Sequence, residues 1–218
     1  MFYIQRLDEI KMRYQQISGY IQAGGGSTRF GSDKALVVFD GKSLLQRTAE
    51  LLEETCGTLK IVSPSASYTD SGISILRDAW PGEGPLGGIV TAIRETRSLS
   101  KEAAWSLIIS CDMPFLSRGW LGFLCQRALE SDAQVVVPES ENGLEPLCAC
   151  WRSDALETLQ SAFDEGVRKV TQGMKRLQME VLDERAWKRF DNDGRLFWNM
   201  NTPEDYAEAK RILESGKR

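Results

Sequence analysis

The sequence predicts a single-domain α/β fold, a Rossmann-like three-layer sandwich with a mainly parallel sheet and helices on both faces. Three observations lead to this prediction. Short apolar segments alternate with segments of helical period, one of the apolar segments (AAWSLIIS) is almost without polar residues, and no long linker divides the 218 residues. Alternating strands and helices are typical of parallel sheets, and strands buried on both faces have continuous apolar sequences.

Polar or glycine-rich residues follow several of the predicted strands. The strand at residues 17–23 runs directly into glycines, and the most apolar strand, at residues 103–110, ends just before Asp112. Open α/β sheets bind ligands outside the carboxyl ends of their strands, so these residues lie where a site is expected. The other strands are predicted at residues 59–63, 73–76, 133–137 and 146–151.

Helix signals separate these strands. Apolar residues at helical spacing predict helices at residues 43–55, 85–96, 121–128 and 153–163, and a shorter helix is expected within 166–177. Ser43 and Gln46 form a possible capping box at the start of the first helix. Thr202 as N-cap and Pro203 in the first turn predict a final helix over residues 203–213. We expect one domain over residues 18–218, preceded by an extension of residues 1–17.

The composition excludes several classes of function. A net charge of −4 and a sequence pI near 5.1 argue against non-specific nucleic-acid binding, which needs a basic surface. The chain has no histidine, so Ser-His-Asp triads and histidine-ligated zinc are excluded. No apolar run approaches the ~18 residues of a membrane span, and the N-terminal residues lack the apolar core of a signal peptide. We expect a cytoplasmic protein that binds neither nucleic acid nor membrane.

The cysteines are expected to be reduced and buried, because most of them lie in or beside apolar runs. Cys148 and Cys150 are separated by one residue, which on a strand directs both side chains to one face. No other close cysteine pair completes a zinc site. The five cysteines are Cys56, Cys111, Cys125, Cys148 and Cys150.

Residues 24–34 are the main candidate for a binding site. This segment contains three consecutive glycines and follows a predicted buried strand directly. Glycine lets backbone N–H groups approach an anion, and Arg29 and Lys34 supply charge suited to a polyphosphate. The segment is not a P-loop, because no lysine follows its last glycine directly. It is not a dinucleotide fingerprint either, because Arg29 stands where the third glycine belongs.

Asp112 is the candidate metal ligand. A single carboxylate beside nucleotide phosphates suits Mg²⁺, which fills most of its octahedral shell with water and phosphate oxygens. The alternative is that Asp112 caps the helix that follows Pro114.

Five stretches of the chain resemble, in order, the motifs of the MobA-like NTP transferase family, the molybdenum cofactor guanylyltransferases. The family's signature loop, LAGG-x-S-x-R-M-G-x-D-K-A-L, is similar to residues 22–36, where Gln22 and Phe30 replace the usual leucine and methionine. The other four stretches are GPLGGI from Gly84, SCDMPF from Ser110, PLCA from Pro146 and NMNTPED from Asn199. The resemblance covers about residues 18–213.

The resemblance implies a Mg²⁺-dependent transfer of GMP from GTP to the terminal phosphate of molybdopterin, with release of pyrophosphate. Lys34 and Arg29 would bind the triphosphate and the departing pyrophosphate, and Asp112 would hold Mg²⁺. The base and phosphates would be framed by the backbone of Gln22, Ala23, Gly24 and Gly25. A phosphate acceptor needs little deprotonation near neutral pH, which suits a chain without histidine.

Three further residues each have a functional and a structural interpretation. By resemblance, Asp78 contacts the nucleotide; otherwise it forms a turn. Ser63 ends the second strand near the expected base pocket, where the family often has a polar residue, but it also precedes Pro64 and could be structural. Asn201 either contacts the metal or the acceptor, or bonds the backbone before the final helix.

Guanine is favoured as the base because relatives that use CTP usually read A-A-G where this chain has Ala23, Gly24 and Gly25. Two enzymatic alternatives remain on the same fold, a molybdopterin cytidylyltransferase and a sugar-phosphate nucleotidyltransferase. A nucleotide-binding sensor is the non-enzymatic alternative. The expected partners are GTP and molybdopterin as substrates, and molybdoenzymes or their chaperones as recipients of the product.

Overall fold

A computed structural model describes residues 14–24, 33–65, 67–100, 104–191 and 193–216. Its central sheet contains β1 (Tyr14–Gln22), β4 (Cys56–Ser63), β5 (Ser74–Arg77), β6 (Trp105–Ser110), β7 (Val135–Ser140), β8 (Gly143–Leu144), β9 (Cys148–Arg152) and β10 (Met179–Leu182). The strand order is β10-β7-β9-β6-β1-β4-β5, and β8 pairs with β7. β9 runs antiparallel to its neighbours β6 and β7, and β8 is antiparallel to β7, whereas the other pairs are parallel.

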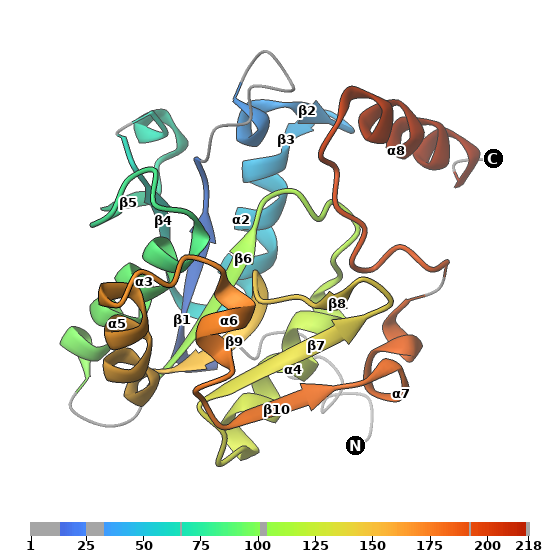
Figure 1. Ribbon diagram of the computed structural model, residues 1–218. Coiled ribbons are helices and arrows are strands. Elements are labelled where there is room, and N and C mark those ends of the chain that lie inside the picture. The colour runs from blue at the N-terminus through green and yellow to red at the C-terminus, as the bar shows by residue number, and fades with distance from the viewer. Residues whose placement is uncertain (1–13, 25–32, 66, 101–103, 192, 217–218) are drawn as a thin grey trace, which may run out of the picture.

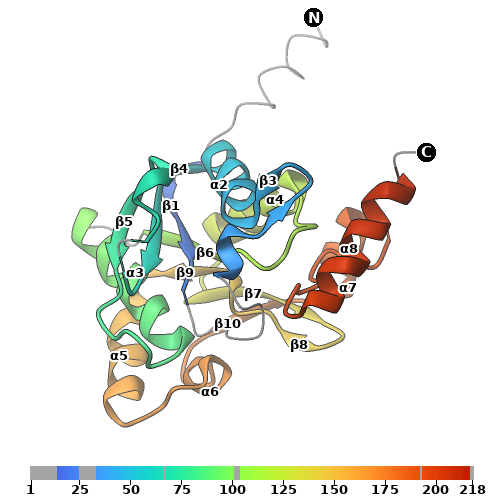
Figure 2. The ribbon, with the colours of Figure 1, turned by 90° about the horizontal axis from the view of Figure 1, so that it is seen from above.

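Helices cover both faces of this sheet (Figure 1, Figure 2). One face is covered by α2 (Leu44–Thr55) and α4 (Arg118–Glu130), and the other by α3 (Pro85–Leu99), α5 (Leu156–Asp164) and α6 (Val170–Met174). The short α7 (Glu184–Trp187) and the longer α8 (Pro203–Gly216) follow β10. The predicted three-layer α/β fold with a mainly parallel sheet is therefore confirmed.

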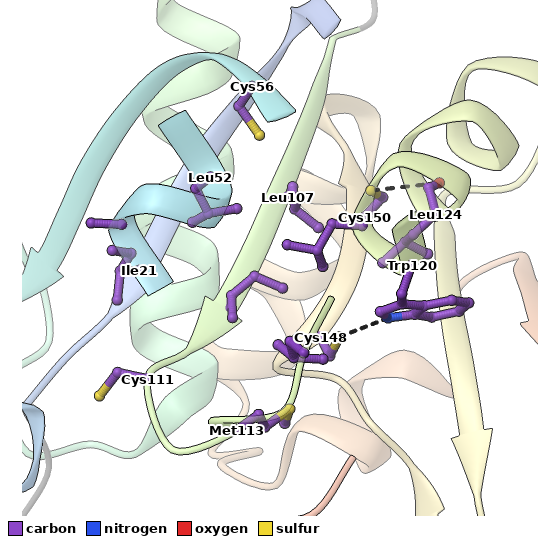
Figure 3. Close-up of a cluster of buried hydrophobic side chains, with 14 of the residues drawn as sticks. Ile21, Leu52, Cys56, Leu107, Cys111, Met113, Trp120, Leu124, Cys148 and Cys150 are labelled. Atoms are coloured by element: carbon purple, nitrogen blue, oxygen red, sulfur yellow. Dashed lines mark hydrogen bonds between the residues drawn. The ribbon is translucent and has the colours of Figure 1, made fainter. Parts of the chain in front are cut away.

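Alternating side chains of the central strands divide the core in two. Ile21 of β1 and Leu107 of β6 pack toward α2 and α4, whereas Tyr20 and Ile108 pack toward α3 and α5. Figure 3 shows the first of these clusters, to which Cys148 and Cys150 both belong. All five cysteines are buried and unbridged, as the apolar sequence around them predicts.

Both predicted helix caps are present. Ser43 Oγ accepts from Gln46 N at 3.1 Å, and Gln46 Oε1 accepts from Ser43 N at 2.8 Å, which completes the capping box of α2. At α8, Thr202 Oγ1 accepts from Asp205 N at 3.1 Å, and Asp205 Oδ2 accepts from Thr202 N at 2.8 Å.

Some short elements have no counterpart in the sequence-based prediction. They are β8, β10, α7 and the two-stranded ribbon of β2 (Val38–Phe39) and β3 (Lys42–Ser43). β10 is a four-residue edge strand that is only partly buried, so its apolar period is too short to recognise. β1 begins at Tyr14, before the expected Ile17. Among the described residues, no helix is both long and apolar enough to cross a membrane.

We expect Gly57→Ala to destabilise the fold. A Cβ at Gly57 would lie 2.6 Å from Gln15 O and 2.8 Å from Gln15 Cα, and this backbone contact between β4 and β1 leaves no room. Such overpacking costs about 1–3 kcal/mol of unfolding free energy, measurable by urea denaturation. Gly122→Ala in α4 is the control, because its Cβ would meet nothing within 4 Å and it should stabilise the helix slightly. Equal stability of Gly57→Ala and the wild type would contradict this packing.

Candidate functional site

The candidate site lies at the carboxyl ends of β1, β4 and β6, at the top of Figure 1. Its centre is Lys34, the first residue of the 3₁₀ helix η3 (Lys34–Leu36). Lys34 Nζ donates to Asp112 Oδ2 at 2.9 Å and to Asn201 Oδ1 at 2.7 Å. The structure therefore brings together three predicted site residues from segments far apart in the sequence.

The backbone of Lys34 is held by the residue before it. Asp33 caps η3, because its Oδ1 accepts from Ala35 N at 3.0 Å. Its other oxygen accepts from the hydroxyl of Tyr68 at 2.7 Å. Burial and the neighbouring Asp33 carboxylate raise the pKa of Tyr68, so the phenol remains a hydrogen-bond donor. These bonds fix the direction in which the lysine side chain leaves the chain.

Asp112 is held from its backbone and does not cap a helix. Its carbonyl oxygen accepts from Met200 N at 2.8 Å, which ties the end of β6 to the segment before α8. Ser117 is the N-cap of α4, with its Oγ accepting from Trp120 N at 3.2 Å, so the helix-cap reading of Asp112 is wrong. Asp112 Oδ1 is buried and has no hydrogen-bond partner among the residues that the structure describes.

Asn201 is held at the entry of α8, and its contact with a metal or the acceptor stays a prediction. Its side chain accepts from Lys34, while its backbone N donates to Asp205 Oδ2 at 2.7 Å before α8 begins. The cap of α8 thus positions the amide oxygen that faces the lysine.

The residues predicted to contact the nucleotide gather at the ends of β1, β4 and β5. Gly24 has φ +91°, and a Cβ there would lie 2.7 Å from Pro64 Cδ and 3.6 Å from Ser63 Oγ. Ser63 is buried, and its carbonyl oxygen accepts from Asp78 N at 2.9 Å. Ala23 N donates to Val62 O at 3.0 Å, which continues the pairing of β1 with β4. Gly25 and Arg29 lie outside the described residues.

Asp78 has the turn role that was the alternative reading. Its Oδ1 accepts from Trp80 N at 2.9 Å and from Thr91 Oγ1 at 3.3 Å. The turn fixes the end of β5 beside Ser63, and contact with a nucleotide remains a prediction for this residue.

Gln22 lies over the first turn of α3. Its Nε2 donates to Pro85 O at 3.1 Å, and its Oε1 is buried without a hydrogen-bond partner in the described part of the chain. A Cβ at Gly88 would lie 2.6 Å from Gln22 Nε2, so a glycine at position 88 makes room for this side chain. Gly88 of the GPLGGI motif therefore makes room for glutamine at position 22, where the family usually has leucine.

Glu145 is a residue of the site that the sequence analysis missed. It lies between β8 and β9, is only 8% exposed, and accepts from Ser140 Oγ at 2.7 Å through Oε1. Burial raises the pKa of Glu145, and the negative charge of Asp112 raises it further. The one signal in the sequence was an acidic residue directly before Pro146, where the PLCA motif begins.

Cys111 is next to Asp112 but does not supply a nucleophile. Burial, and then the charge of Asp112, raise the pKa of its thiol to about 12, so it stays protonated near neutral pH. Its side chain belongs to the core cluster of α2 and α4.

The α/β fold and the position of Lys34, Asp112 and Asn201 at the carboxyl edge of its sheet fit an α/β nucleotidyltransferase. The MobA-like NTP transferase domain matches residues 19–180 of the sequence. The chain therefore belongs to the MobA-like NTP transferase family.

Relatives of known name match nearly the whole chain. A probable molybdenum cofactor guanylyltransferase of Chloroflexus aggregans is 30% identical over 205 residues, which cover 92% of this chain and 96% of the relative. The molybdenum cofactor guanylyltransferase of Desulfosudis oleivorans is 28% identical over 203 residues, with coverage of 92% and 98%. The crystal structure of molybdopterin-guanine dinucleotide biosynthesis protein A from Archaeoglobus fulgidus has the same fold, with a TM-score of 0.78, 23% identity and coverage of 91% and 99%.

We expect Glu145→Gln to raise the melting temperature at neutral pH. The pKa of Glu145 is raised in the folded state, so the folded protein binds this proton more tightly than the unfolded chain does. The ionised carboxylate therefore lowers stability above the ordinary carboxyl pKa, and this effect disappears below about pH 4. Glutamine keeps an acceptor for Ser140 without the charge. Thermal melts between pH 3 and 8, at about one-unit steps, measure the difference.

Glu139→Gln is the matched control, because Glu139 is an exposed carboxylate on the same hairpin. Its melting temperature should follow the wild type throughout. A Glu145→Gln protein that is less stable than the wild type at pH 7 would contradict the sign of the expected effect.

Proposed function

We propose that this protein transfers GMP from GTP to molybdopterin, which releases pyrophosphate and forms molybdopterin guanine dinucleotide. One observation carries the proposal: Lys34 Nζ bonds both Asp112 Oδ2 and Asn201 Oδ1 at the sheet edge where Gly24 ends β1. The names of the two guanylyltransferase relatives support the choice of base and acceptor. The proposal includes a cytoplasmic location and delivery of the product to molybdoenzymes or their chaperones.

The residues at this edge fit Mg²⁺. Asp112 and Asn201 offer carboxylate and amide oxygens, the hard donors that Mg²⁺ prefers. The buried Asp112 Oδ1 accepts no hydrogen bond from any residue in the described ranges. Within the described ranges, no three acidic or cysteine side chains form a metal-binding cluster. This suits an ion that takes few protein ligands and completes its shell with phosphate oxygens and water. When bound, Mg²⁺ would neutralise charge on the reacting phosphates.

The protein's part in the reaction is positioning and charge balance. An oxygen of the acceptor phosphate attacks the α-phosphorus of GTP, the bond from that phosphorus to the bridging oxygen breaks, and pyrophosphate leaves with the electron pair. The second pKa of a phosphate monoester is about 6, so no histidine base is needed. Lys34 shares its two acceptors with the proposed metal, so we expect it to donate to the triphosphate when nucleotide binds. Arg29 is proposed to balance charge on the departing pyrophosphate.

Gly24 alone does not decide the base. Its positive φ and its contact with Pro64 require glycine in this chain, whichever nucleotide binds. The choice of guanine rests on the names of the relatives. The polar residue Gln22 ends β1, two residues before Gly24. GTP and CTP must therefore be compared directly.

We expect purified protein with Mg²⁺ and molybdopterin to release pyrophosphate from GTP at least about 100-fold faster than from CTP, ATP or UTP, expressed as kcat/KM. Pyrophosphate release is followed for each nucleotide, with and without acceptor. Preferred use of CTP would make the protein a cytidylyltransferase. Binding of GTP without any release would make it a sensor.

We expect Asp112→Ala to abolish turnover and to weaken Mn²⁺ binding while the fold is retained, because the variant loses the proposed metal ligand. Turnover, Mn²⁺ binding by electron paramagnetic resonance, and circular dichroism measure the three properties. An unchanged rate would remove Asp112 from the mechanism.

Lys34→Ala is the matched comparison, because it removes the partner of Asp112 but leaves both oxygens in place. Loss of one preorganised charge contact should weaken the transition state by about 2–4 kcal/mol in kcat/KM for GTP. Mn²⁺ binding should persist, because the cation no longer competes with the ammonium. A loss confined to thermal stability would make Lys34 structural.

A further inference from the structure

Glu145 lies on the side of Asp112 opposite the proposed nucleotide site. In the sheet order, β1, β4 and β5 lie on one side of β6, and they carry Gly24, Ser63 and Asp78 at their ends. On the other side are β9 and β7, and the segment from β8 to β9 crosses between them at this same edge (Figure 1). If the nucleotide binds on the β1 side of β6, the acceptor is expected to bind on the β9 side.

The backbone of Glu145 is fixed at this place. Glu145 N donates to Pro138 O at 2.9 Å, and its own carbonyl oxygen accepts from Cys148 N at 3.0 Å. Two residues later, Leu147 O accepts from Ser110 N at 2.8 Å, at the end of β6 and close to Asp112. The backbone around Glu145 is therefore held at this sheet edge by β7 on one side and β6 on the other.

The carboxylate of Glu145 has no cationic partner within the part of the chain that the structure describes. Among the described residues it is more than nine-tenths buried, its side chain accepts a hydrogen bond from Ser140 Oγ, and the like charge of Asp112 acts on it. A buried carboxylate without a cationic partner lowers the stability of the folded protein. An apolar residue of similar size at this position would make the fold more stable. This placement is typical of a group that is kept for a ligand.

We propose that Glu145 binds the pterin ring of the acceptor; this inference rests on the proposed function. The 2-amino-4-oxo pyrimidine ring of a pterin presents two adjacent donors, the ring N3–H and the 2-amino group. A carboxylate has two oxygens that accept such a pair side by side, and Ser140 uses only part of this capacity. The acceptor would then lie with its phosphate at Asp112 and its ring at Glu145.

Guanine has a similar donor pair, so the base of GTP is a competing ligand for Glu145. The arrangement of the strands favours the pterin, because Gly24 and Ser63 lie on the other side of β6. A direct role in metal binding is the second competitor, because Asp112 is near. The experiment must separate the three ligands.

The test compares wild type and Glu145→Gln in two measurements. In the first, 6-hydroxymethylpterin and the matching lumazine, which has an oxo group in place of the 2-amino group, are titrated against protein with Mg²⁺ and GDP, and their fluorescence is followed. The wild type should bind the pterin about tenfold more tightly than the lumazine, and the variant should lose this preference. In the second, KM for molybdopterin should rise about tenfold in the variant, with KM for GTP unchanged.

Each other outcome overturns the inference. A wild type that does not prefer the pterin over the lumazine, or a variant that retains the preference, shows that Glu145 does not read the 2-amino group. A variant with a raised KM for GTP assigns Glu145 to the base. Mn²⁺ binding of the variant is also measured by electron paramagnetic resonance, and weakened binding assigns Glu145 to the metal. Glu139→Gln should match the wild type in all measurements.

The experiments also distinguish a failure of the proposed function from a failure of the pterin contact. If the wild type binds pterin through Glu145 but releases no pyrophosphate from GTP with molybdopterin, the transfer reaction is wrong and the pterin site stands. If transfer proceeds and Glu145→Gln leaves KM for molybdopterin unchanged, the pterin contact is wrong and the transfer reaction stands.

Discussion

The hydrogen bonds of the Lys34 ammonium group hold the site together. This one group joins the segment after β1 to the end of β6 and to the entry of α8 through Asp112 and Asn201. The side chains of Lys34 and Asp112 are 12% and 18% exposed, so solvent screens their attraction less than it would at the surface. Partial burial also removes hydration from both charges, and this offsets much of the gain. The pair therefore contributes more to the arrangement of the site than to the stability of the fold.

The partners of the lysine are held in turn by further contacts around α8. Asp112 O accepts from Met200 N, and the hydroxyl of Tyr206 in α8 donates to Val38 O at 3.0 Å. Phe39 packs against Tyr206 with ring centroids 6.4 Å apart, so the β2–β3 ribbon and α8 support each other beside the sheet edge (Figure 2). These contacts allow a helix that is not part of the main layers to present Asn201 to the site.

The layers, the order of the main elements and the helix caps could be predicted from the sequence, because each has a local signal. The capping box of Ser43 and Gln46 and the apolar strand before Asp112 are examples. The contact of Lys34 with Asn201 was not predicted, since nothing local relates residues so distant in the sequence. Glu145 was missed because its burial depends on β8 and the β7–β9 pairing, and β8 is too short to recognise. The requirement for glycine at position 24 could likewise not be predicted, because it depends on the position of Pro64, which follows β4.

The separation of Lys34 and Asn201 along the chain, 167 residues, also affects how the protein is made. On the ribosome, the sheet strands that carry Gly24 and Asp112 emerge well before the segment that carries Asn201. Contacts between such distant segments form late, because the entropy of closing a long loop must be overcome first. A nascent chain that stops before Asn201 has its sheet edge but lacks the amide oxygen that accepts from Lys34, so this arrangement of side chains forms only after most of the described residues have been synthesised.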